Sequence, residues 1–449
     1  MLLYIHVPFC RTKCNYCAFY SEPLVPSEHL LARAAELPGY ADLGRERMRL
    51  WLDALFMEMA RRSDELDRPQ VKTVFFGGGT PSLVPPDTIH VIINRIKRYF
   101  KLDSKAEITL EVNPESISPA SARELVFAGV NRFSLGAQTL DDRQLQLMGR
   151  VHGAADVTRA YEALRRAGGR NISLDMIWGL PGQSVNSWLS ELKQILELKP
   201  DHLSAYALTI EPGTPFAEWV DDGMFLLPKE REQANMYIRG AELLEEAGYI
   251  HYEVSNFARM GYQCRHNMGY WEGDDYLGVG PAATSTINGR RWTNLADLQA
   301  WSAAVQAGQS WSAGSAGSGS STVEILSPTD RVLELLMLRL RTCRGLRVKA
   351  YTELTGRDFM RDNKTLIHTL HKNGLIRIRH GYLRLTLNGM LVSNSILERM
   401  FEAVREQLTP MDFASAKVLH PVGNGPESAL DVDELARQQA KAGGEAQCD

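Results

Sequence analysis

The sequence lacks the features expected of a membrane-spanning, secreted or nucleic-acid-binding protein. No apolar run reaches the roughly 20 residues that a membrane helix needs, so we expect no stable membrane insertion. The 50 basic residues are outnumbered by 54 acidic ones, and a net charge of -4 provides no electrostatic basis for binding nucleic acid. Only six of 449 residues are cysteines, too few and too unevenly spaced for a disulfide framework, which favours a reducing compartment.

The N-terminal residues also lack the marks of a targeting segment. Residues 1–10 contain no basic n-region, no long apolar stretch and no Arg- and Ser-rich presequence. We therefore expect a cytoplasmic protein. The alternative is an organelle, either a mitochondrion or a plastid, if a presequence is missing from the chain.

Strand and helix patterns alternate through the first half of the sequence. Six such units are typical of a parallel sheet covered by helices, and they fit either a partial barrel or a doubly wound sheet. Strands are predicted at residues 2–7, 71–76, 107–112, 132–137, 171–177 and 202–208. Helices are predicted at residues 47–62, 86–100, 119–128, 154–167 and 186–198.

The rest of the chain predicts a second, smaller domain. Helices at 328–341, 358–372 and 387–404 surround a hairpin at 375–387 that turns at His380 and Gly381, an arrangement resembling a winged helix. Composition indicates a loop or irregular insertion at 22–46. We expect five regions, namely a core at 1–225, a helical and loop extension at 226–309, a Ser/Gly-rich flexible linker at 310–324, a C-terminal α+β domain at 325–408 and a disordered tail at 409–449.

Polar and glycine-rich residues occur where the predicted strands end. The run 77–80 follows the second strand, whereas Glu111, Gln138 and Asp175 lie late in the next three. Parallel sheets and barrels build their sites at the carboxyl ends of the strands, so these residues are expected on one rim. Glu111 and Asp175 interrupt apolar strands, which ordinary loop polarity does not explain. The glycines alone indicate only a tight turn, because they lack the spacing of a phosphate or dinucleotide loop.

Three cysteines after the first strand, Cys10, Cys14 and Cys17, are spaced to bind one metal centre. A cubane iron–sulfur cluster has four irons, so three thiolates would leave one iron open. Structural zinc is the alternative, but it usually takes four protein ligands, and only His6 lies near in sequence. The spacing therefore predicts a 4Fe–4S cluster.

A second group of rare residues lies at 264–271. His266 is a candidate ligand for haem iron among aromatic residues, and Cys264 is its competitor. The alternative is a histidine whose hydrogen bonds are satisfied inside an aromatic patch, and residue chemistry alone favours this alternative. The isolated Cys343 and Cys448 are expected to be inert.

Taken together, segments 4–17, 75–82, 149–152, 175–181 and 208–212 resemble the oxygen-independent coproporphyrinogen III oxidase family of radical S-adenosylmethionine (SAM) proteins. The resemblance covers most of residues 2–404, and within the family it is greatest to the haem-chaperone branch. It implies a partial (β/α)6 barrel whose cluster binds SAM at the open iron. It also implies a SAM site lined by Tyr4, Gly78, Gly79, Thr80, Glu111, Gln138, Arg150 and Asp175.

Two features separate this chain from the oxidases of that family. The oxidases carry a further cysteine two residues after the third, where this chain has Phe19, and a longer segment before the motif. In contrast, His266-Asn267-x-x-Tyr270-Trp271 matches the haem-binding motif of the chaperone branch. The resemblance thus implies that His266 binds haem, with Asn267 placed to fix the ring tautomer.

The resulting hypothesis is a haem chaperone that delivers haem to acceptors such as respiratory enzymes and whose cluster is served by an electron donor. The enzyme alternative is a radical SAM coproporphyrinogen oxidase of porphyrin biosynthesis, and we do not expect that activity. A plain iron–sulfur electron carrier is disfavoured by the polar rim, and a DNA-binding regulator by the acidic balance.

Overall fold

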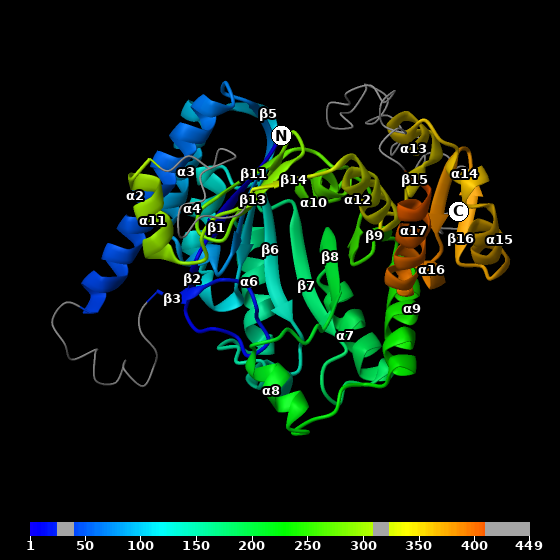
Figure 1. The fold of residues 1–449 in the computed structure, drawn as a ribbon. Coiled ribbons are helices and arrows are strands. Elements are labelled where there is room, and N and C mark those ends of the chain that lie inside the picture. Colours follow the sequence, from blue (N-terminus) through cyan, green and yellow to red (C-terminus); the bar gives the residue numbers. More distant parts are fainter. Residues whose placement is uncertain (25–39, 309–322, 409–449) are drawn as a thin grey trace.

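The protein is described by a computed structural model that covers residues 1–24, 40–308 and 323–408. Six parallel strands in sequence order form the middle of a 12-stranded sheet, so all six predicted strands are confirmed (Figure 1). Their bounds are β1 (Leu2–Val7), β4 (Gln70–Gly78), β5 (Lys101–Val112), β6 (Arg132–Gln138), β7 (Ile172–Trp178) and β8 (His202–Ala207). Of the two alternatives, sequence order without reversal is that of a partial (β/α)6 barrel rather than a doubly wound sheet.

Amphipathic helices between these strands cover one face of the sheet (Figure 1). Helix α3, for example, buries Ile89, Ile92, Ile93 and Ile96, the spacing of a single helical stripe. Ser118 and Ser184 cap α4 and α7 by accepting backbone hydrogen bonds three residues on. The helices are α2 (Tyr40–Glu65), α3 (Pro86–Tyr99), α4 (Pro119–Ala128), α5 (Asp142–Leu147), α6 (Ala154–Arg166) and α7 (Val185–Glu197).

The predicted loop at 22–46 is partly wrong. Helix α2 begins at Tyr40, and residues 22–23 form the short strand β3 (Glu22–Pro23) beside β2 (Phe9–Cys10). The prolines and the Gly39 that suggested a loop all precede Tyr40, so nothing after them prevents helix formation. The intervening residues 25–39 lie outside the described part of the chain.

The region predicted as a helical and loop extension also contains strands that lengthen the sheet at both ends. Strand β11 pairs in parallel with β1, and β10 pairs antiparallel with β8. These strands have only three or four residues, too short for a pattern of alternation to reveal them. The elements are α8 (Pro215–Asp221), α9 (Glu230–Glu246), β9 (Ile250–Glu253), β10 (Asn256–Ala258), α10 (Arg265–Trp271), β11 (Tyr276–Val279), β12 (Thr284–Ile287), β13 (Arg290–Thr293) and α11 (Leu298–Gln306).

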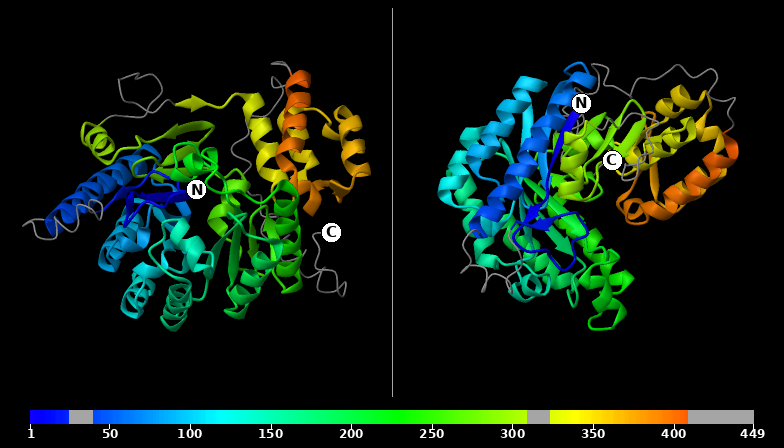
Figure 2. Two further views of the ribbon diagram at one scale, coloured as in Figure 1. Left: turned by 90° about the horizontal axis from the view of Figure 1, so that it is seen from below. Right: turned by 60° about the vertical axis from the view of Figure 1, so that its left-hand side comes forward.

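The C-terminal part packs beside α9 and α10 (Figure 2). Its hairpin turns at His380 and Gly381, both with positive φ as the turn requires, which confirms the predicted hairpin. The predicted helices at 358–372 and 387–404 are each interrupted, at Asn363 and Val392. The elements are β14 (Glu324–Ile325), α12 (Pro328–Leu340), β15 (Leu346–Arg347), α13 (Val348–Thr355), α14 (Phe359–Asp362), α15 (Lys364–Lys372), β16 (Ile376–Arg379), β17 (Tyr382–Leu385), α16 (Leu387–Leu391) and α17 (Ser393–Gln407).

The predicted linker and tail fall almost wholly outside the described residues. Only the end of the linker is described, and there residues 324–325 form β14 against β13 rather than part of a flexible segment. Among the described helices, none is long and apolar enough to cross a membrane.

Candidate iron–sulfur and SAM site

The three-cysteine loop lies at the carboxyl ends of the parallel strands and is fastened at its two ends and its middle. At the ends, β2 pairs with β3, which brings Cys10 beside Pro23. In the middle, the Asn15 backbone N–H donates to the Met148 carbonyl (3.0 Å), and the Asn15 side chain donates to the Leu147 carbonyl (2.9 Å). The Phe216 N–H donates to the Asn15 carbonyl (3.0 Å). The loop is therefore held in position by α5 and α8.

The thiol environments suit ligands of a metal centre. Burial raises the pKa of Cys10 and of Cys17, so these thiols are neutral without a metal. Two donors nevertheless point at the sulfurs, from Thr80 Oγ1 to Cys10 Sγ (3.6 Å) and from Arg150 Nη1 to Cys14 Sγ (3.5 Å). Such donors stabilise thiolates once a metal has displaced the protons. The donor set thus fits a 4Fe–4S cluster.

Arg150 joins the cluster loop to the ends of β5 and β6. Its Nη2 donates to Asn113 Oδ1 (2.7 Å) and to the Gly136 carbonyl (3.2 Å), while Asn113 Nδ2 donates to Thr80 Oγ1 (3.1 Å). The structure therefore brings the predicted Thr80 and Arg150 together through Asn113. The sequence places Asn113, with Pro114, at the end of the third predicted strand and hence on the rim, but Asn113 was not among the predicted SAM-site residues.

Two carboxylates lie on neighbouring parts of the same rim. Glu111 Oε2 accepts from the Gly78 N–H (3.2 Å), and Asp175 accepts from Ser134 Oγ and Ser173 Oγ (2.8 Å each). Burial, together with the negative charge of Asp175, raises the pKa of Glu111 to about 8. The charge of Arg132 offsets this shift only in part, so the carboxylate pair favours a cationic ligand, and SAM carries both a sulfonium and an ammonium group.

The glycines at 78 and 79 are required by close packing inside the protein. A Cβ on Gly78 would come 2.5 Å from the His6 ring, and one on Gly79 would come 2.5 Å from the Phe9 carbonyl oxygen. Strand β4 must therefore pass unusually close to β1 and the start of the cluster loop. The Tyr4 hydroxyl is hydrogen-bonded to His6 Nδ1 (3.1 Å), so Tyr4 belongs to the same packed group. Gln138 has a left-handed φ of 64°, a conformation that marks the bulge where β6 ends.

His266 lies in a different environment from the rim residues. It is 1% exposed, its Nδ1 is hydrogen-bonded to Thr73 Oγ1 (2.8 Å) and its Nε2 to the Tyr270 hydroxyl (3.1 Å). Burial, with the charge of Arg132, lowers the pKa of His266 to about 3, so the ring is neutral. Thr73 and Tyr270, rather than the expected Asn267, thus occupy its ring nitrogens. Haem iron can reach Nε2 only if Tyr270 moves away.

Helix α10, which carries His266, is anchored at its first turn. Glu107 on β5 accepts from the backbone N–H groups of Arg265 and His266 (3.0 Å each) and from Cys264 Sγ (3.6 Å). Burial raises the pKa of Cys264 to about 12, so this residue is a neutral thiol and a weak candidate for an axial ligand. These bonds to Glu107 fix the start of α10 against β5.

A buried chain of hydrogen bonds connects this helix to the rim. The Cys264 N–H donates to the Tyr252 hydroxyl (3.3 Å), which is bonded to His202 Nε2 (2.7 Å). His202 Nδ1 is bonded to Ser173 Oγ (2.8 Å), and Ser173 Oγ donates to Asp175 (2.8 Å). Sequence reasoning missed His202 and Tyr252, because isolated polar residues in short strands carry no motif.

No ready-made site for a single ion is present in the described ranges, where no three His, Cys, Asp or Glu side chains are grouped to hold one metal. The six-stranded barrel, the three-cysteine loop and the rim of Thr80, Arg150, Glu111 and Asp175 together define a radical SAM protein.

Comparison with known proteins identifies the branch. The radical SAM superfamily matches residues 4–195, and the HemN C-terminal domain matches residues 326–392. The chain is 37% identical to the heme chaperone HemW of Synechocystis sp. over 76% of this chain and 78% of that protein. It is 31% identical to HemW of Bacillus subtilis over 88% and 97%, respectively. The chain therefore belongs to the HemW-like family of radical SAM proteins, which implies a 4Fe–4S cluster and SAM.

The chain is also similar to a mitochondrial protein and to an enzyme of known structure. The mitochondrial radical S-adenosyl methionine domain-containing protein 1 of Bos taurus is 34% identical over 91% of this chain and 89% of that protein. Coproporphyrinogen III oxidase (HemN) from Escherichia coli, a radical SAM enzyme of known structure, has a TM-score of 0.70 at 22% identity, covering 91% of this chain and 90% of that one. At that identity, the likeness to HemN shows a shared fold.

Proposed function

We propose that this protein is a haem chaperone that binds a 4Fe–4S cluster through Cys10, Cys14 and Cys17, binds SAM at the rim, and delivers haem to acceptors such as respiratory enzymes. The observation that carries the radical SAM part is the fastened cysteine loop beside Arg150, with Glu111 and Asp175 on the same rim. The haem part is supported by the names of the HemW relatives and by the His-Asn-x-x-Tyr-Trp segment.

The rim residues have separable tasks in this proposal. Arg150 and Thr80 offset negative charge on the thiolates, and Glu111 and Asp175 attract the cationic groups of SAM. Asn113 fixes the orientation of Arg150, so the guanidinium does not swing away from Cys14. When bound, the cluster supplies an open iron for SAM and a site that accepts one electron from a donor protein.

The test of the cofactors is anaerobic reconstitution of the full chain. We expect about four irons per chain, as for a cubane, and an electron paramagnetic resonance signal in the reduced protein that changes when SAM is added. Stoichiometric zinc in the purified protein, or a spectrum indifferent to SAM, would contradict the assignment. Haem titration of the same preparation tests the cargo, and transfer of haem to an apo-enzyme tests the delivery.

The coproporphyrinogen oxidase alternative has its own test. Phe19 stands where the oxidases carry a further cysteine, and its side chain is 70% exposed. We expect the reconstituted protein, supplied with SAM, reductant and coproporphyrinogen III, to release no protoporphyrinogen IX. Catalytic turnover of that substrate would replace the chaperone proposal by the enzyme.

A further inference from the structure

Asp175 on the rim is held by two serine hydroxyls that come from neighbouring strands. Ser134 Oγ donates to one carboxylate oxygen and Ser173 Oγ donates to the other, each at 2.8 Å. In the register of the sheet, Ser134 on β6 lies directly beside Ser173 on β7, and Ser173 lies directly beside His202 on β8. Side chains of three parallel strands therefore meet on one face of the sheet behind the carboxylate.

His202 extends this arrangement into the core. Its Nδ1 is 2.8 Å from Ser173 Oγ, and its Nε2 is 2.7 Å from the Tyr252 hydroxyl. Tyr252 in turn accepts from the backbone N–H of Cys264 (3.3 Å), the residue that caps the start of α10. Ser173 and His202 are fully buried and Tyr252 is 3% exposed, so water does not compete for these hydrogen bonds.

The two ends of this chain of hydrogen bonds fix the direction of every bond between them. At the α10 end a backbone N–H can only donate, and at the rim the Asp175 carboxylate accepts. Burial holds the pKa of His202 well below its ordinary value, so the ring is neutral and carries one hydrogen. Because Ser173 donates its only hydrogen to Asp175, it must accept from His202 Nδ1. Nε2 is then bare and accepts from the Tyr252 hydroxyl.

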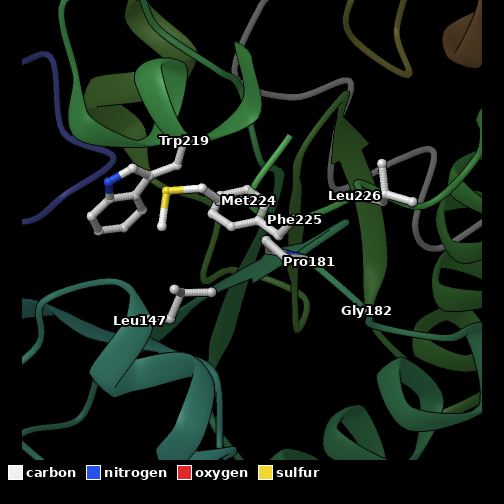
Figure 3. A pocket seen from close by; sticks show the side chains of 7 residues that line it. All are labelled: Leu147, Pro181, Gly182, Trp219, Met224, Phe225 and Leu226. Carbon is white, nitrogen blue, oxygen red and sulfur yellow. The ribbon is translucent and has the colours of Figure 1, made fainter. Parts of the chain in front are cut away.

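The part of the chain that follows Asp175 gives this carboxylate no comparable support. Beyond β7, the chain leads to an apolar pocket of about 620 Å³ (Figure 3). The pocket is lined by Leu147, Pro181, Gly182, Trp219, Met224, Phe225 and Leu226. Among the residues that the structure describes, no hydrogen bond joins this lining to Asp175, whose partners are the two serines. The orientation of the carboxylate therefore depends on the serines and on the residues behind Ser173.

We propose that His202 and Tyr252 are positioning residues for SAM binding, because they hold the Asp175 carboxylate from the start of α10. The inference rests on the proposed function, in which SAM binds at the rim, and it names residues that act on that site from outside it. Hydrogen bonds aligned in one direction polarise one another, so the bonds of Tyr252 and His202 strengthen the donation by Ser173. A carboxylate fixed in this way binds the polar groups of SAM without first having to be ordered.

The test is a SAM titration of the reduced, cluster-loaded full chain, followed by its electron paramagnetic resonance signal. His202→Leu removes both ring nitrogens, whereas the amide nitrogen of His202→Asn can take the place of Nδ1 and donate to Ser173. Tyr252→Phe removes the hydroxyl alone. Tyr249→Phe is the matched control, because Tyr249 is 2% exposed and donates to the Pro200 carbonyl (2.6 Å), outside the chain of bonds that ends at Asp175.

Two further measurements make the variants comparable. Iron content verifies that each variant is folded and loaded with its cluster. The free energy of unfolding shows whether the two tyrosine variants lose similar stability, as expected for two buried hydroxyls that each lose their hydrogen bonds. A difference in SAM affinity between them is then a property of the site and not of overall stability.

We expect SAM affinity to fall about tenfold in His202→Leu and about threefold in Tyr252→Phe, to be closer to native in His202→Asn, and to stay native in Tyr249→Phe. Native affinity in both His202→Leu and Tyr252→Phe overturns the inference, as does an equal loss in the two tyrosine variants. Equal losses in the two His202 variants overturn the role of the Nδ1 donor. Where His202→Leu fails to fold, the two tyrosine variants decide. A native chain whose cluster signal does not respond to SAM contradicts the SAM part of the proposed function instead.

Discussion

The rim and the α10 helix both carry residues that the sequence motifs single out. They differ in how completely their polar and charged groups are paired with partners inside the protein. At the rim, burial and the charge of Asp175 raise the pKa of Glu111 despite the opposing charge of Arg132, and Arg150 and Thr80 point at thiols. At α10, His266 has a partner on each ring nitrogen, and Glu107 accepts from the first turn of the helix. Incomplete compensation is what a binding site needs, whereas full compensation stabilises a fold. The arrangement of the rim therefore suits ligand binding, whereas the contacts around α10 stabilise the fold.

The largest expected effect lies at the rim. Replacing Cys10, Cys14 or Cys17 with Ala removes one of three thiolates, so the 4Fe–4S cluster should be lost and its paramagnetic signal with it. The control is Cys343→Ala, which changes a partly buried cysteine outside the loop and should leave iron content at the native value. A fully loaded triple mutant would show that the cluster is held elsewhere.

The corresponding change at α10 should lower stability instead. Glu107→Ala leaves the N–H groups of Arg265 and His266 without their acceptor in a buried site, so we expect a loss of about 2–4 kcal/mol in the free energy of unfolding. Denaturant unfolding measures it. The cysteine loop makes no contact with Glu107 in the hydrogen bonds described above, so the iron content per folded chain should be unchanged. A selective loss of the cluster would show that the rim and α10 do not act separately.

A third expected effect concerns pH. Because the pKa of Glu111 is raised to about 8 in the folded chain, folding favours its protonated form, and stability falls as pH rises from about 4.5, the pKa of an ordinary Glu, to about 8. SAM, a cation, favours the ionised form, so its affinity should rise over the same window.

Glu111→Gln tests both halves of this expectation. We expect SAM binding to weaken about tenfold near pH 8 and to lose most of its dependence on pH, as read by titration of the reduced cluster signal. Between about pH 4.5 and about pH 8, the unfolding free energy of the variant should decline less than that of the native protein. A native pH profile in the variant would remove Glu111 from the site.

The smallest expected effect is at Thr80. Thr80→Val keeps the shape but removes the hydroxyl that donates to Cys10 and accepts from Asn113. The cluster should still assemble, and its reduction potential should fall, because fewer hydrogen bonds to sulfur stabilise the reduced state less. Thr209→Val, outside these contacts, is the comparison for the potential measured by redox titration. An unchanged potential would show that the hydroxyl has a structural role alone.

The sequence predicted the parallel strands well because β1 and β4–β8 are long, apolar and separated by amphipathic helices. It predicted the rim because carboxyl strand ends converge in any such sheet. It could not show that Thr73 and Tyr270 saturate His266, since these residues meet only in three dimensions. Nor could it place the short strands β9–β13, whose three or four residues pair across the edges of the sheet. The residues linking β7 to α10, such as His202, carry no local signature.

The fastening of Asn15 has a consequence for how the cofactor is acquired. Its three hydrogen bonds to α5 and α8 use no cysteine sulfur, so we expect them to keep the course of the loop when no cluster is bound. Little conformational entropy is then lost when a cluster is inserted. We therefore expect the chain to stay folded when oxidation destroys its cluster. The same chain could then receive a new cluster repeatedly, without new protein synthesis.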